Sequence, residues 1–369
     1  MRVFIKKRTF LRHFLRDRPA RKRRNRLCPS GGAVSPRLPR FRTPLLTISL
    51  TILYEMHIIM EMKISVKKSL GIIYILGAAL CFALMNLFVN LAGTLPLIQK
   101  VFFRNALTAV VVFFILLFQK DKFRIKSKSC LIWLFLRAAV GYVGVILNFY
   151  AIDHIGSISD ASILNKLSPF FAILFSVALL KENPTIPEVV FTLTAFAGAM
   201  CVVNPRFDMS VLPALSGFLS GACAGFAYTC VRILAVKGER GIITVFFFSA
   251  FSTIVSLPFM IVQFQPMSWM QLLYLMLAGA AATGGQFFIT AAYRLAPAKE
   301  IAVFDYAQVF FAAILGYFIL SQQIKPLSIV GYVIIIGAAV GKWIYTLSLA
   351  KKSKTVAAEP EEKKQNDDG

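Results

Sequence analysis

Long apolar runs recur along this chain and restrict what it can fold into more than any other feature. Runs of roughly 20 residues follow one another from residue 70 to residue 348, and each could cross a hydrocarbon core of about 30 Å as a helix. Only 16% of the residues are charged, against about 25% in a typical soluble domain. The sequence therefore predicts an all-α polytopic membrane protein. We place ten transmembrane helices at 70–92, 101–119, 130–152, 160–180, 186–204, 210–236, 241–264, 269–293, 299–320 and 326–348.

The net charge of +24 does not indicate nucleic-acid binding, because of where the charge lies. Residues 1–61 carry half of the excess and form a basic extension that we predict to be disordered. The cluster RKRRNR at 21–26 is similar to a nucleic-acid signal, but we favour a cytoplasmic tail or untranslated sequence read as protein. We expect residues 1–61 to be dispensable for transport and leave open whether they belong to the native product.

Basic residues gather in every second loop, which sets the predicted orientation. The intervening loops are poor in basic residues, with Lys100, Arg206 and Lys325 as the main ones. Since basic loops stay in the cytoplasm, both termini are predicted to be cytoplasmic, in a plasma (inner) membrane, with residues 349–369 as a charged cytoplasmic tail. The basic loops hold Lys63, Lys67, Lys68, then Lys120, Lys122, Arg124, Lys126, Lys128, then Lys181, Lys237, Arg240, Arg294, Lys299, and finally Lys351, Lys352 and Lys354.

The chain repeats itself with a shift of 140 residues and no gap. Residues 150–174 fall on 290–314, and Phe170-Phe171-Ala172 falls on Phe310-Phe311-Ala312. The repeats cover 66–204 and 210–348, with five predicted spans each. Because five is odd, the second repeat must enter the membrane with the opposite orientation. Inverted repeats are typical of secondary transporters, whose substrate site lies between the halves near the bilayer midplane.

Four stretches carry a resemblance to a known family: GAALCFALMNLFVNLAG (77–93), FFRNAL (102–107), 160–182 and 291–320. Over about 66–350 the chain resembles the drug/metabolite transporter superfamily, specifically EamA-type permeases with two five-helix repeats. The resemblance implies a transporter of small solutes, such as amino acids or nucleotide sugars, without naming one. The family usually ends its fourth and ninth spans with a glutamate. Glu182 matches the first, whereas Gln322 stands at the second.

One group of candidate cavity residues lies in the fourth predicted span. Lys166 is about 9 Å from the outer surface at 1.5 Å per residue, beside Asn165 and one turn from Ser162. Pro169 removes a backbone hydrogen bond just below. These residues look like the wall of a wet cavity, and snorkelling of the lysine to the surface is the alternative.

Asp305 is the one acid that this interpretation places well inside a span. It aligns with Asn165, and Tyr306 aligns with Lys166. Inversion would separate Asp305 from Lys166 by about 12 Å along the membrane normal, so we expect opposite ends of one cavity rather than a salt bridge. Asp305 could bind a cationic group or carry a coupling proton. It could instead be tied to Arg294 or a tyrosine.

The other polar residues inside the spans are weaker candidates. Arg137 is about 10 Å deep and indicates either function or a helix–helix bond. Lys100, Arg104 and Arg232 can reach the headgroups by snorkelling, which we favour over a functional role. Three amides could line a cavity or merely bond across helices: Asn86, Asn148 and Gln286. The glycines of GFLSGACAG (217–225) form a small-residue face that we interpret as close helix packing.

The predicted function is that of a secondary transporter moving a small polar metabolite by alternating access. A non-transporting sensor or assembly scaffold would be expected to have a sizeable soluble domain, and an intramembrane enzyme would need clustered catalytic groups. A channel would need a ring of repeated acids or a filter-like loop. We predict no enzyme activity, cofactor, metal site or nucleic-acid partner. The expected partners are the lipid bilayer and a small-molecule substrate, and the oligomeric state, a homo-oligomer included, stays open. The excess of interior basic residues favours a substrate with a carboxylate or phosphate.

Overall fold

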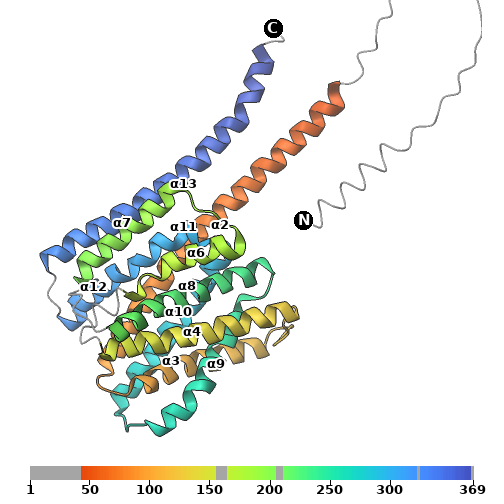
Figure 1. Ribbon diagram of the computed structural model, residues 1–369. Coiled ribbons are helices and arrows are strands. Elements are labelled where there is room, and N and C mark those ends of the chain that lie inside the picture. Colours follow the sequence, from red (N-terminus) through yellow and green to blue (C-terminus); the bar gives the residue numbers. More distant parts are fainter. Residues whose placement is uncertain (1–42, 155–163, 205–210, 322–324, 367–369) are drawn as a thin grey trace, which may run out of the picture. The chain divides into compact units, whose positions relative to one another are not determined.

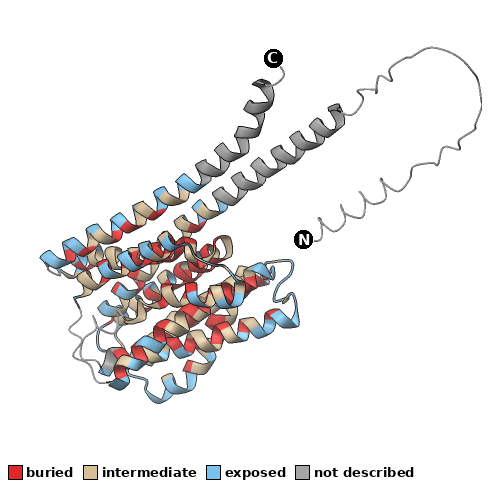
Figure 2. Ribbon diagram, turned by 45° about the horizontal axis from the view of Figure 1, so that its top comes forward, coloured by how far each residue is buried: buried red, intermediate tan, exposed pale blue. Residues whose placement is uncertain are grey.

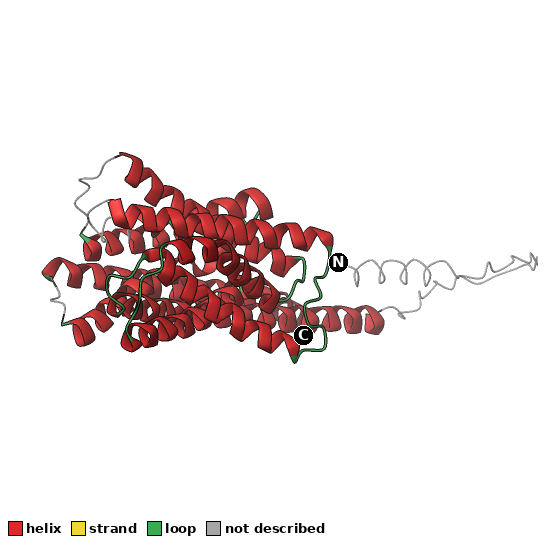
Figure 3. Ribbon diagram, turned by 90° about the horizontal axis from the view of Figure 1, so that it is seen from below, coloured by secondary structure: helices red, strands yellow, loops and turns green. Residues whose placement is uncertain are grey.

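The protein is described by a computed structural model that covers residues 43–154, 164–204, 211–321 and 325–366. Residues Leu53–Gly369 form one compact unit. Within the described ranges every regular element is a helix (Figures 1 and 3). The helices are α2 (Thr43–Leu91), α3 (Leu97–Leu117), α4 (Lys128–His154), α6 (Ser168–Leu180), α7 (Ile186–Val203), α8 (Val211–Val236), α9 (Gly241–Val262), α10 (Trp269–Leu295), α11 (Ala298–Ile301), the 3₁₀ helix η1 (Ala302–Tyr306), α12 (Ala307–Leu320) and α13 (Pro326–Asn366).

The all-α membrane architecture predicted from the apolar runs is confirmed. Nine of the predicted spans contain a described helical segment that is long and apolar enough to cross a membrane. The fourth predicted span is represented by α6, which has 13 residues. Large apolar side chains such as Phe114, Ile254 and Phe318 are exposed, where lipid would cover them. Figure 2 marks the exposed positions along the helices in pale blue.

Two helices are longer than the sequence analysis predicted. α2 begins at Thr43, so residues 43–61 are helical where a disordered extension was expected. The stretch between Pro44 and Gly71 contains no proline or glycine, and nothing in it breaks a helix. α13 continues to Asn366, through most of the predicted tail. Residues 1–42 lie outside the described part of the chain.

Each repeat contains a discontinuous helix at the corresponding position. In the first repeat, Lys166 and Leu167 form a turn immediately before α6, which begins with Pro169 in its first turn, a position that proline favours. In the second repeat, the backbone passes from α11 through the 3₁₀ helix η1 into α12. Both helices then end in the left-handed conformation at aligned residues, Lys181 (φ 58°) and Ser321 (φ 52°).

The two repeats pack through equivalent helices. The third helix of the first repeat, α4, packs on the first helix of the second, α8. The reciprocal pair is α10 and α2, where a Cβ added at Gly285 would lie 2.7 Å from the Phe82 ring. The second helices, α3 and α9, pack on each other, and so do the fifth, α7 and α13 (Figure 1). Any space between these pairs therefore lies between the repeats.

The predicted small-residue face of α8 makes close contacts, as expected. A Cβ at Gly221 would lie 2.8 Å from the backbone oxygen of Leu164, and one at Gly225 would lie 2.7 Å from the nitrogen of Ala172. The glycines thus allow α8 to lie directly against α6 and the turn before it. This contact holds the break in the fourth span, with Lys166, in place.

Candidate functional site

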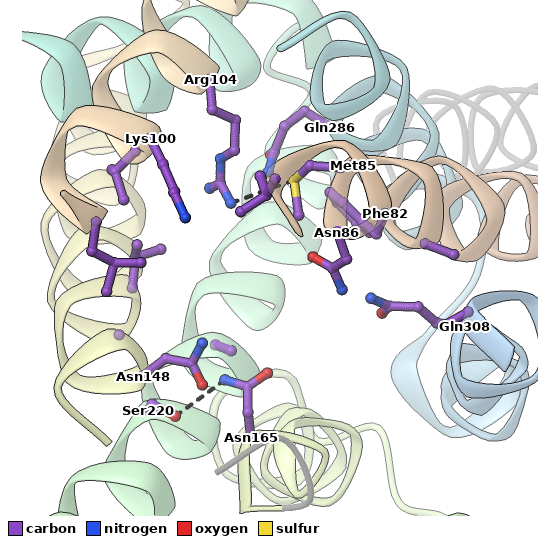
Figure 4. Close-up of a pocket in the computed structure, with 18 of the residues that line it drawn as sticks. Phe82, Met85, Asn86, Lys100, Arg104, Asn148, Asn165, Ser220, Gln286 and Gln308 are labelled. Carbon is purple, nitrogen blue, oxygen red and sulfur yellow. Dashed lines mark hydrogen bonds between the residues drawn. The ribbon is translucent and has the colours of Figure 1, made fainter. Parts of the chain in front are cut away.

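A cavity of about 810 Å³ lies between the two repeats. Its volume is within the range of small-molecule sites, about 300–1,000 Å³. The first repeat contributes Asn86, Lys100, Arg104, Arg137, Asn148 and Lys166 to its polar lining, and the second contributes Ser220, Tyr228, Gln286 and Gln308. Figure 4 shows Arg104 and Lys100 extending into the cavity from one helix, with Asn86 and Gln308 lying near each other on another side.

Lys166 is bound by the discontinuous helix of the other repeat. Its Nζ donates a hydrogen bond to Gln308 Oε1 at 2.7 Å and lies 3.5 Å from Asp305 Oδ2. The Tyr306 hydroxyl donates to the backbone oxygen of Lys166 at 3.0 Å. The two breaks therefore meet each other, and Lys166 joins them at the wall of the cavity.

The ion pair corrects the expectation that Lys166 and Asp305 lie about 12 Å apart. That separation assumed continuous helices perpendicular to the membrane, starting at the predicted span limits. Both helices are interrupted at these residues, and the long lysine side chain reaches across. The alternative partner, Arg294, instead donates to the backbone oxygen of Glu239. Asp305 and Tyr306 are buried behind Lys166 and do not line the cavity.

Arg137 lies in the cavity wall and makes a helix–helix bond, one of the two roles that its depth indicated. It is 3% exposed, and its Nη2 donates to Gln286 Oε1 on α10 at 3.1 Å. Its guanidinium carbon lies 3.9 Å from the centre of the Phe248 ring. Both partners are neutral. The Nε atom of Arg137 is buried without a hydrogen-bond partner in the described part of the chain.

The structure places in the cavity two cations for which the sequence analysis favoured snorkelling. Lys100 and Arg104 lie one turn apart on α3, and both line the cavity. Lys100 Nζ donates to the backbone oxygen of Gly93 at 2.5 Å, and Arg104 Nη1 lies 3.5 Å from the sulfur of Met85. A signal was available, because Lys100, Arg104 and Thr108 repeat every four residues and so share one helix face.

The amide candidates largely line the cavity. Asn165 donates to the Ser220 hydroxyl on α8 at 3.1 Å, as the dashed line in Figure 4 marks. Asn86, Asn148 and Gln286 also line it. The side-chain oxygen of Asn148, Oδ1, is buried without a hydrogen-bond partner among the described residues. Ser162, the remaining candidate, lies outside the described residues. Tyr228, Ser220 and Gln308 were not predicted, because single polar residues in an apolar run do not reveal their direction.

A separate set of charged side chains is paired at the helix ends predicted to be cytoplasmic. Arg232 binds Glu182 at 2.9 Å. Lys342, of which 1% is exposed, lies 2.9 Å from Glu188 and 3.7 Å from Glu300. Glu300 also binds Lys68 at 2.8 Å. The contacts of Lys342, Glu188, Glu300 and Lys68 join α13, α7, α11 and α2. The pair of Arg232 and Glu182 joins α8 to the end of α6.

The geometry agrees with what comparison with known proteins finds. The sequence profile of the EamA-like transporter family matches residues 69–204 and 211–342, which together are most of the chain. The chain belongs to the EamA-like transporter family. The predicted family and the two-repeat organisation are therefore confirmed. As an EamA protein the chain is an integral, multi-pass membrane transporter, and its family is one of transporters rather than enzymes.

Relatives of this EamA protein occur in bacteria and mammals. It is 33% identical over 275 residues to the pseudopaline exporter of Pseudomonas aeruginosa strain UCBPP-PA14, covering 73% of this chain and 94% of that protein. It is 27% identical to human solute carrier family 35 member G1, over 74% of this chain and 80% of that protein. An S-adenosylmethionine uptake transporter of Rickettsia prowazekii is 26% identical over half of this chain and 62% of that protein.

A solved crystal structure has the same fold. It superposes with a TM-score of 0.64 at 15% identity and covers 75% of this chain and 98% of that one. At this identity the likeness concerns the fold alone. The cavity, the two breaks and the ion pair described above are features of this chain's own residues.

Proposed function

We propose that this EamA transporter is a secondary transporter that carries a small polar metabolite across the plasma (inner) membrane by alternating access. The substrate binds in the cavity between the repeats, which comprise residues 66–204 and 210–348. Both termini face the cytoplasm. The observation that carries the proposal is the polar cavity of about 810 Å³, bordered at Lys166 by the meeting of two discontinuous helices.

Discontinuous helices are typical of transporter binding sites, because backbone that leaves the helix can only be tolerated where it lines a cavity or is buried in protein. Here the breaks occur at aligned positions of the two repeats. The cavity wall carries polar side chains among apolar ones, with amides from both halves and cations from the first repeat. Such a wall suits a small solute whose polar groups contact these amides and cations.

The distribution of contacts supports access from one side at a time. The cavity reaches Gly93, between α2 and α3, and Lys100, in the first turn of α3. It also reaches Leu320, at the end of α12. These positions are external in the proposed topology. The paired charges of Lys68, Glu300 and Lys342 lie at the opposite helix ends. We interpret this arrangement as a conformation accessible from outside and sealed towards the cytoplasm.

The relatives support a small-molecule substrate while differing in direction. One is named as an exporter of pseudopaline and another as an uptake transporter of S-adenosylmethionine. Direction and substrate therefore have to be measured for this chain.

Two measurements test the proposal in sequence. Metabolite pools inside and outside cells that produce the protein are compared with those of cells that lack it, and a small set of compounds should change distribution. The purified protein in liposomes should then exchange these compounds with saturation and counterflow. If no compound changes distribution, or if flux rises linearly with concentration as through a pore, the proposed function is wrong.

A further inference from the structure

The positive charge of the cavity is concentrated on one side. Four cations line it, Lys100, Arg104, Arg137 and Lys166, and no acidic side chain of the described residues does. Lys166 is offset by Asp305, which lies 3.5 Å away. Arg104 and Arg137 have no ion pair with a carboxylate of the described chain. The positive charge is therefore concentrated where α3 and α4 face the cavity.

The contacts of the two arginines leave most of their hydrogen-bonding capacity unused. A guanidinium has five N–H donors. Arg137 uses one on Gln286 and rests on the Phe248 ring, while its Nε stays unpartnered among the described residues. Arg104 contacts the Met85 sulfur, a weak acceptor. Neither set of partners is negatively charged, although a buried charge normally has a partner of opposite charge.

Snorkelling does not explain Arg137. It is nine residues into α4, which begins at Lys128, so it lies about 14 Å from that helix end at 1.5 Å per residue. Its guanidinium is held on Gln286 and Phe248 inside the protein rather than at the surface. A positive group inside a spanning segment is costly and is by default a functional one.

The repeats do not share this feature, so it does not follow from the symmetry of the fold. The 140-residue shift places Thr244 opposite Arg104 and Leu277 opposite Arg137. The cationic end of the cavity belongs to the first repeat alone. The opposite end, at the meeting of the two breaks, holds the neutralised pair of Lys166 and Asp305, together with Gln308.

We propose that the substrate is an anion whose carboxylate or phosphate oxygens bind between the guanidinium groups of Arg104 and Arg137. This inference rests on the proposed function and adds the chemical class of its substrate. Guanidinium groups match both oxyanions with paired, charge-assisted hydrogen bonds. The anion supplies the negative charge that the described chain does not place beside these arginines. The amide side chains of Asn148, Asn165 and Gln308 face the remainder of the molecule.

Liposomes containing the purified protein test the proposal with a mixture of metabolites in place of one chosen compound. A metabolite extract is divided at pH 7 by anion exchange into a bound, anionic fraction and an unbound fraction. Each is incubated with the liposomes, and retained compounds are identified by mass spectrometry against protein-free liposomes. Treating the anionic fraction with alkaline phosphatase distinguishes phosphate monoesters, whose retention disappears, from carboxylates, whose retention persists.

Variants connect the result to the two arginines. Arg104→Gln and Arg137→Gln should each lower the apparent affinity for the retained compound about 10- to 150-fold, the effect of losing one charge-assisted hydrogen bond. Arg124→Gln makes the same change in an exposed loop and should leave uptake unchanged. Arg104 is half-buried, so its variant remains informative if Arg137→Gln does not fold.

The outcomes separate the two claims. Retention of compounds from the anionic fraction, lost in the arginine variants, is the expected result. Retention from the unbound fraction, or anion uptake that survives both arginine variants, would overturn the substrate class while leaving the transporter function intact. Retention from neither fraction would contradict the proposed function itself.

Discussion

Tyr306 and Lys166 hold the same position in the two repeats, and they contact each other: the Tyr306 hydroxyl donates a hydrogen bond to the backbone oxygen of Lys166 at 3.0 Å. A contact between equivalent residues means that the pseudo-symmetry axis of the repeats passes close to this point. Lys166 adds the contacts to Gln308 and Asp305. The site where the two repeats meet is therefore also the site where each of them interrupts its fourth helix.

The ion pair between Lys166 and Asp305 should be visible as energetic coupling. Lys166→Met leaves the buried Asp305 carboxylate without its cation and should lower the melting temperature of the purified protein. Asp305→Asn should lower it less, because Lys166 keeps Gln308. The double variant should be more stable than the sum of both changes indicates, with a coupling of about 0.5–3 kcal/mol for residues in contact. Additive effects in this double-mutant cycle would show that the pair makes no net contribution.

The buried Lys342 should matter more to stability than Lys68, although both bind Glu300. The Lys342 side chain is 2% exposed and that of Lys68 is 34% exposed. Removing one partner of a buried pair costs about 3–5 kcal/mol, whereas an exposed pair contributes about 0–1 kcal/mol. Thermal unfolding in detergent should therefore show a larger decrease for Lys342→Met than for Lys68→Met. Equal decreases would argue against a structural role for the buried lysine.

Because α8 lies so close to α6, adding one methyl group at Gly225 should lower the stability of the protein. In Gly225→Ala the new Cβ would lie 2.5 Å from Phe171 Cβ, and overpacking of this kind costs about 1–3 kcal/mol. Gly337→Ala is the matched control, because nothing lies within 4 Å of its added Cβ, and alanine favours a helix over glycine. The melting temperature should decrease only for Gly225→Ala. A decrease of similar size in Gly337→Ala would mean that glycine flexibility, rather than packing, explains the effect.

The proposed orientation can be measured with fusions. A reporter that is active only in the cytoplasm should be active after Lys354 and silent when inserted between Pro205 and Pro213. This follows from the alternating basic loops. The opposite pattern in well-expressed fusions would reverse the topology and, with it, the side from which the cavity is reached.

The sequence predicted most of the fold, because apolar length and a gapless repeat are properties of the chain itself. It also identified Lys166, Asn165 and Arg137 as candidate site residues, because charges and amides inside a membrane span are costly and so indicate a function. It failed for Lys100 and Arg104, because their position near a span end favoured snorkelling. It also failed for the distance from Lys166 to Asp305, because the position of a helix break and the tilt of its segments depend on packing between the repeats. Lys342 escaped notice for a related reason, as its partners Glu188 and Glu300 come from other spans.

The central claim, that the cavity between the repeats is open to the outside and sealed towards the cytoplasm when no substrate is present, is tested by thiol reactivity in the absence of substrate. All six native cysteines are replaced, and Ala312, which lines the cavity, is changed to cysteine. Its repeat equivalent Ala172, which is fully buried, serves as the control position. A membrane-impermeant thiol reagent should modify Ala312→Cys in right-side-out vesicles and not in inside-out vesicles, and should spare Ala172→Cys in both. Equal modification of Ala312→Cys from both sides, or none from either, would contradict the account.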